Sequence, residues 1–133
     1  MSETQQLTDL QIAILRVLWE RGSATAAEVT EALRVSRGLA QQTIATILSR
    51  LERRGIVRHQ TRNRQYVYHP VVTEPEVRRT MLEELTDRLF EGDVAALVTH
   101  LLSAREISPG DLARVKNLIA AHEASRGARH ADS

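Results

Sequence analysis

The sequence predicts a mainly α-helical fold in which three helices and a β-hairpin are followed by three further helices. Three observations predict it. Apolar residues recur at helical spacing along most of the 133-residue chain, and three of the helical segments open with a Thr followed three residues later by Glu or Gln. Between residues 56 and 69 the pattern changes to that of two short strands.

The N-terminal helices are marked by their start and stop signals. The first helix follows a capping box at Thr8–Gln11 and ends at Gly22, since glycine adopts the left-handed conformation that closes helices. The second follows a capping box at Thr25–Glu28. A turn at residues 36–38 precedes a third helix, predicted from about residue 40 to residue 54.

The next segment reads as a β-hairpin. Residues 56–60 and 65–69 are the two strands, residues 61–64 form the turn between them, and Pro70 stops the second strand. Three helices followed by such a hairpin are the elements of a winged helix-turn-helix. We therefore expect a first domain over residues 1–71.

The rest of the chain predicts a helical arm over residues 72–124 and a small, polar, disordered tail over residues 125–133. A module of about fifty residues rarely buries enough apolar surface by itself. We expect it to bury that surface against a second copy, as a dimerisation arm; packing back onto its own winged helix is the alternative. The predicted dimer interface comprises Val77, Met81, Leu85, Phe90, Leu97, Val98, Leu101, Leu102, Leu112, Val115, Leu118 and Ile119.

The charge of the chain is unevenly distributed. Between Arg34 and Arg64 there are eight arginines and one acid, Glu52, which gives this segment a charge of +7. Because the whole chain carries only +1, the remainder carries −6. A basic block within an otherwise acidic chain indicates a polyanionic partner, and its position in a winged helix favours double-stranded DNA.

The third helix supplies the candidate reading surface. Its apolar stripe is expected to face the core, which leaves polar side chains and arginines outside. Glutamine can form two hydrogen bonds with adenine, threonine can contact phosphate or a thymine methyl, and arginines near the helix end and at the hairpin tip suit the phosphate backbone. The candidate DNA-binding residues are Gln41, Gln42, Thr43, Thr46, Arg50, Arg53, Arg54, Arg62, Asn63 and Arg64.

In the order of its motifs the chain resembles the penicillinase-repressor family of BlaI, MecI and CopY type. The segments that carry the resemblance are Ile14–Trp19, Thr43–Leu51, Arg62–Tyr68 and Leu97–Val98, within a match over roughly residues 7 to 122. The resemblance implies a dimeric transcriptional repressor that binds an inverted-repeat operator. It also implies relief of repression when a membrane-bound sensor metalloprotease leads to cleavage of the arm, here near His100 and Leu101.

Several function classes find no support in the sequence. It has no cysteine, which removes disulfides and thiolate metal sites, including the paired cysteines of the copper-responsive branch. It has no phosphate-binding glycine loop, nucleophile elbow or zinc-protease motif, so we expect no enzyme, cofactor or metal. No signal segment or membrane-length apolar run is present, so we expect a cytoplasmic protein without direct membrane insertion.

Two other readings stay open. One is a ligand-sensing winged-helix regulator with an effector site at the dimer interface, which the low aromatic content of 3% disfavours only mildly. The other is a winged helix used for protein contacts alone, and the basic block counts against it.

Overall fold

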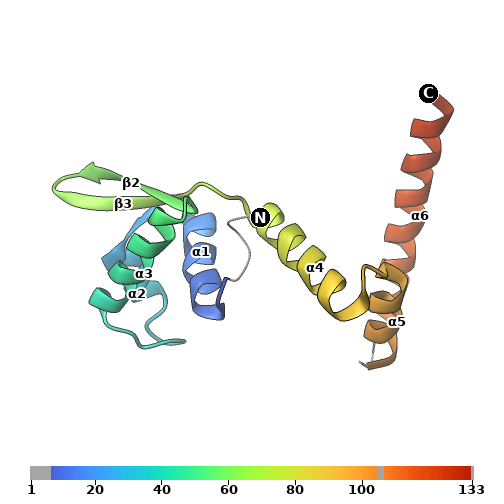
Figure 1. The fold of residues 1–133 in the computed structure, drawn as a ribbon, viewed down its shortest axis with the longest axis horizontal. Helices are drawn as coiled ribbons and strands as arrows, with labels where there is room; N and C mark the ends of the chain where they lie inside the picture. Colours follow the sequence, from blue (N-terminus) through green and yellow to red (C-terminus); the bar gives the residue numbers. More distant parts are fainter. Residues whose placement is uncertain (1–6, 105–106, 133) are drawn as a thin grey trace. The chain divides into compact units, whose positions relative to one another are not determined.

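The computed structural model describes residues 7–104 and 107–132. Along the chain the elements are α1 (Asp9–Arg21), β1 (Ala24–Thr25), α2 (Ala26–Ala32), α3 (Gln41–Arg53), β2 (Val57–Arg62), β3 (Gln65–Pro70), α4 (Glu74–Phe90), α5 (Val94–Ala104) and α6 (Pro109–Asp132). The predicted class is confirmed: three helices and a β-hairpin, hereafter the wing (β2 and β3), precede further helices (Figure 1).

The helix starts follow the capping motifs of the sequence. At Thr8, Thr25 and Thr73 the hydroxyl accepts the backbone N–H three residues on, and the Gln or Glu at that position accepts the N–H of the threonine in return. Two of the first four backbone donors of each helix are thus satisfied locally. At the start of α6 the Ser108 hydroxyl accepts the N–H of Asp111 at 3.1 Å. These local bonds explain why the helices begin where the sequence predicts.

The wing is a tight hairpin. Asn63 and Arg64 form its two-residue turn, and both have positive φ, 50° and 66°. Such a turn matches the right-handed twist of the strands that it joins, and Asn tolerates this conformation better than most residues. In Figure 1 the hairpin extends away from the helices, so its tip lies outside the packed core.

The sheet contains a strand that the sequence did not indicate. The strand order is β1-β3-β2, and β1 pairs antiparallel with β3 through Ala24 opposite Tyr68 and Thr25 opposite Val67. Because β1 has only two residues, it shows no alternating pattern by which it could be recognised. The pairing fixes the base of the wing to the segment between α1 and α2.

One apolar core holds α1, α2, α3 and the sheet together. Its largest fully buried side chains are Ile14, Leu15, Leu18, Val29, Ile44, Leu48, Leu51, Ile56 and Val57. Trp19 packs against this cluster, and its Nε1–H donates to the carbonyl oxygen of Val72 at 2.9 Å. This bond ties α1 to the segment that leads into α4.

The start of α4 belongs to the same core, which corrects part of the predicted interface. Val77 is only 3% exposed and so presents no free side chain to a second copy, whereas Met81 packs partly against the core cluster and stays partly exposed on α4. The chain accordingly divides into compact units Met1–Gly92 and Asp93–Ser133, whereas the sequence placed the boundary at residues 71 and 72. The difference arises because the apolar face of the first turns of α4 contacts the winged helix.

The second unit contains α5 and α6. Helix α6 continues to Asp132, through most of the segment for which the sequence predicted a disordered tail. Its last residues include several alanines, whose high helix propensity accounts for the continuation despite Gly127. No helix within the described ranges is both long enough and apolar enough to span a bilayer.

Candidate nucleic-acid interface

Helix α3 is held by one face and open on the other. Ile44, Leu48 and Leu51 are completely buried and anchor it in the core, as their spacing of three and four residues predicts. Its N-cap residue, Ala40, makes no side-chain hydrogen bond to the first turn. The N-terminal backbone donors of α3 are therefore left without the side-chain cap that α1, α2 and α4 have.

The outer face of α3 carries a shallow hollow of about 340 Å³. Its lining consists of Gln42, Ala45, Thr46, Ser49, Arg50 and Arg53. Gln42, Thr46, Arg50 and Arg53 are among the predicted DNA-binding residues, and Ala45 and Ser49 lie on the outward face that the helical spacing predicts. The Thr46 hydroxyl donates to the Gln42 carbonyl oxygen at 2.9 Å, so its proton is used within the helix.

The remaining candidates on α3 do not line the hollow. Gln41 and Thr43 are exposed in the first turn of α3. Arg54 is the C-cap residue, is partly buried and is engaged in an interaction of its own. The structure thus separates Arg54 from the open face that Arg50 and Arg53 share.

The predicted residues of the wing tip are all exposed. Arg62 ends β2, and Asn63 and Arg64 form the turn. Among the residues that the structure describes, no ion pair engages Arg50, Arg53, Arg62 or Arg64, while arginines elsewhere, such as Arg79 with Glu83, are paired. The positive charge of these four arginines is therefore not neutralised by an ion pair within the part of the chain that the structure describes.

The single acid of the basic segment has a structural partner that sequence reasoning missed. The Glu52 carboxylate lies 2.7 Å from Nδ1 of His59 and accepts the backbone N–H of His59 at 3.1 Å. The His59 ring stacks on Tyr66, with centroids 3.9 Å apart and planes 12° from parallel, and lies 5.7 Å from Tyr68. Burial, followed by the charge of Glu52, raises the pKa of the Tyr68 hydroxyl. The isolation of Glu52 among arginines was the available signal.

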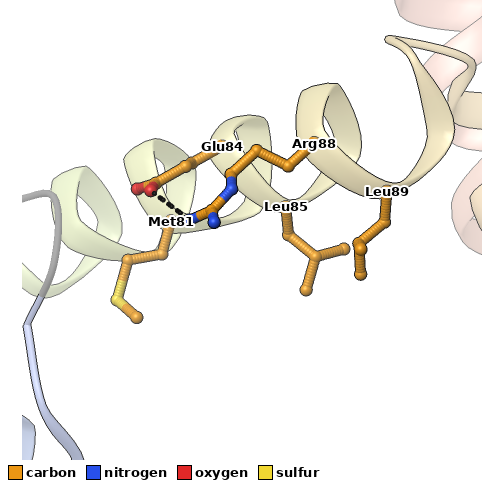
Figure 2. A pocket seen from close by; sticks show the side chains of 5 residues that line it. All are labelled: Met81, Glu84, Leu85, Arg88 and Leu89. Carbon is orange, nitrogen blue, oxygen red and sulfur yellow. Dashed lines mark hydrogen bonds and ion pairs between the residues drawn. The ribbon is translucent and has the colours of Figure 1, made fainter.

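Two apolar grooves lie on α4, away from α3. In the first, of about 350 Å³, Figure 2 shows Met81, Leu85 and Leu89 pointing to one side of the helix, while Arg88 pairs with Glu84 at 3.3 Å. The second, of about 500 Å³, lies between α1 and α4. Its lining consists of Ile12, Arg16, Trp19, Glu74, Val77, Arg78, Met81, Leu82 and Leu85.

Within the described parts of the chain, no three His, Asp or Glu side chains are grouped as a metal ion requires. The surfaces of the first unit that are suited to binding a partner are therefore the cationic and polar surface of α3 and the wing tip, and the apolar grooves on α4.

Comparisons with known proteins agree with this arrangement. The penicillinase repressor family matches residues 7–121. The penicillinase repressor of Bacillus licheniformis is 23% identical over 123 residues, covering 92% of this chain and 96% of that protein. The methicillin resistance regulatory protein MecI of Mammaliicoccus sciuri is 18% identical over 118 residues, covering 89% of this chain and 96% of that protein.

A solved structure supports the fold. The crystal structure of the YusO protein from Bacillus subtilis superposes with a TM-score of 0.52 at 20% identity, covering 96% of this chain and 78% of that one. At this identity the likeness concerns the fold alone. From the match over residues 7–121, the chain belongs to the penicillinase repressor family, whose members are DNA-binding transcriptional repressors and not enzymes.

Proposed function

We propose that this chain is a homodimeric transcriptional repressor that binds an inverted-repeat operator through α3 and the wing tip. One observation supports the proposal most strongly: exposed polar side chains, and arginines without an ion pair to any described residue, cover the outer face of α3 and the tip of the adjacent hairpin. An α-helix fits the major groove of B-DNA, and a winged helix presents its third helix in that way.

The residues of α3 divide into two roles. Gln42 suits a bidentate contact with adenine, and Thr46, whose hydroxyl proton is committed to the helix, suits contact with a thymine methyl. Arg50 and Arg53 lie toward the C-terminal end of α3, where guanidinium groups contact phosphates. Gln41 and Thr43, in the first turn of α3, lie beside the hollow on its outer face that would contact the bases.

The wing tip adds a second contact with the duplex. Arg62 and Arg64 carry two guanidinium groups on a turn, with Asn63 between them. Such a tip contacts the phosphate backbone or enters the minor groove beside the site that the helix reads. These contacts are insensitive to sequence and weaken as salt rises, whereas those of Gln42 and Thr46 specify bases.

Dimerisation is supported by apolar surface outside the winged helix. On α6, Leu112, Val115, Leu118 and Ile119 recur every three or four residues and are exposed, Leu118 by 60%. Exposed side chains of the same kind on α4 and α5 are Leu82, Leu85, Leu89, Val94, Val98, Leu101 and Leu102. Apolar surface of this extent marks an interface, and a two-fold dimer matches an inverted-repeat operator.

The family resemblance adds a route for relief of repression, by cleavage near His100 and Leu101 through a membrane-bound sensor metalloprotease. Both residues are exposed on α5, and a cut there separates α6 and its apolar face from the winged helix. The helix must open locally before a protease binds this segment, since proteases require extended chain. Fragment masses of the tagged repressor, recovered from cells before and after treatment with cell-wall antibiotics, test this step.

The ligand-sensing alternative has one structural feature in its favour, the apolar groove of about 500 Å³ between α1 and α4. A ligand that binds the folded protein there raises its Tm, and the rise grows with the logarithm of the ligand concentration relative to its Kd. A thermal-shift screen with apolar and acidic small molecules distinguishes this reading from a repressor that has no effector.

The experiment that tests the main proposal is DNA binding by fluorescence anisotropy across a salt series. The probes are a duplex from the region upstream of the repressor's own gene and a scrambled duplex of equal length. We expect preference for the first by roughly a thousandfold or more, with affinity falling steeply as salt rises. Equal binding to both would refute an operator there, and no binding to either at low salt would refute DNA recognition.

A further inference from the structure

We propose that Glu52 and His59 are positioning residues for DNA binding, holding the wing at a set angle to α3 so that both contact one duplex. The inference rests on the proposed function. It concerns the wing-base cluster, defined as Glu52, His59, Tyr66 and Tyr68.

The cluster links three elements in sequence. Glu52 lies in the last turns of α3, His59 in β2, and both tyrosines in β3. The carboxylate contacts His59 twice, at the backbone N–H and at the ring Nδ1. A bond to the backbone of β2 restrains the strand itself and not merely a side chain, so Glu52 sets where the wing leaves the helix.

The two tyrosines connect His59 on β2 with β3, the other strand of the hairpin. His59 lies opposite Tyr68 in the register of β2 and β3, and its ring stacks on that of Tyr66, two residues along β3. Tyr68 is buried in the core, whereas Tyr66 is 53% exposed. The cluster therefore runs from the core toward the part of the wing that ends in Arg62 and Arg64.

Because the Glu52–His59 contact is partly buried, it holds its geometry better than an ion pair on the surface does. The side chains of His59 and Glu52 are only 27% and 31% exposed, and the two residues are separated by the turn that joins α3 to β2. Fully exposed pairs contribute little because water screens them and side-chain entropy opposes them. A half-buried carboxylate with both a backbone donor and a ring partner holds its geometry better.

The role proposed for Glu52 and its charge predict opposite effects of its removal on DNA affinity. Glu52 is the only acid among the arginines of residues 34–64, so its removal makes that segment more positive. By electrostatics alone Glu52→Ala tightens DNA binding. If Glu52 positions the wing, the same variant binds more weakly, because the wing arginines no longer meet the duplex together with α3.

The test compares Glu52→Ala with Glu31→Ala, which has the same charge change at an exposed residue of α2 paired with Arg34. Anisotropy with the upstream duplex should show about tenfold weaker binding for Glu52→Ala and no weakening for Glu31→Ala. Glu52→Gln, which keeps an oxygen to accept the His59 N–H, should recover most of the loss. Binding by Glu52→Ala as tight as that of the unmodified chain overturns the proposal.

A double-mutant cycle separates positioning from general destabilisation. In a chain that already carries Arg62→Gln and Arg64→Gln, adding Glu52→Ala should cost less than about twofold, because no wing contact remains to be lost. The same tenfold loss in that background would show that Glu52 acts elsewhere than through the wing, which overturns the proposal.

A readout without DNA keeps this inference distinct from the proposed function. Amide hydrogen exchange should become faster at His59 and along the wing in Glu52→Ala, with protection in α1 unchanged. If the unmodified chain fails to bind either duplex, the proposed function is wrong. If amide exchange in the wing is the same in Glu52→Ala as in the unmodified chain, the wing-base cluster does not restrain the wing, whatever the DNA-binding result.

Discussion

The most direct prediction concerns the two arginines of the wing tip. Replacing Arg62 and Arg64 by Gln removes two positive charges per chain from residues that are exposed and form no ion pair among the described residues. Each phosphate contact contributes about −0.9 to the slope of log K against log salt for B-DNA. The slope should therefore become shallower by about 1.8 per chain, or about 3.6 for a dimer that places both wings on DNA.

The assay is the anisotropy salt series, carried out on the unmodified chain, the wing variant and a control. The control, Arg78→Gln with Arg79→Gln, removes the same charge from α4, where these arginines pair with Glu74 and Glu83 at 3.2 Å. The control should keep the slope of the unmodified chain, because only charges that displace counterions from DNA contribute to it. Tm should stay the same in the wing variant, since neither arginine touches the core.

One result refutes the reasoning. If the wing variant and the unmodified chain show the same slope, the tip does not contact phosphate, and the unpaired charge of the wing serves another purpose. A slope that falls equally in the wing variant and the control would show that net charge alone governs binding.

Three further predictions test the core, the dimer and the titration of the sheet. Leu48→Ala, at a completely buried position of α3, should lower the free energy of unfolding in urea by about 2–5 kcal/mol, whereas Val35→Ala, at a position 93% exposed, should change it by less than about 0.5 kcal/mol. Leu118→Asp on the exposed face of α6 should shift the chain from dimer to monomer in sedimentation equilibrium while helical circular dichroism is retained; an unchanged dimer would remove α6 from the interface. The pKa of Tyr68 is raised above its ordinary value of 10.0, so the unfolded chain loses this proton at a lower pH than the folded chain does. The free energy of unfolding should therefore fall as pH rises from 10 through the folded pKa. In alkaline denaturation curves, Tyr68→Phe should show a smaller fall in the free energy of unfolding over that range.

Much of the fold was predictable because its signals are local. A capping box acts over four residues and an apolar stripe over one or two turns, so Thr8, Thr25 and Thr73 mark their helices without reference to the rest of the chain. The outward face of α3 follows from the same reasoning, since the three residues that anchor it determine by spacing which ones lie opposite. The order of these motifs also predicts membership of the penicillinase repressor family.

Other features depend on contacts between residues distant in sequence, and only the tertiary structure decided them. The pairing of Ala24 with Tyr68 joins segments more than forty residues apart, and a two-residue strand carries no periodicity of its own. An apolar residue such as Val77 has the same local pattern whether it faces its own core or a second copy, so burial alone assigns it. Glu52 likewise reads as one charge among arginines until folding brings His59 to within 2.7 Å, because a hydrogen bond across a turn is set by the packing of helix on strand.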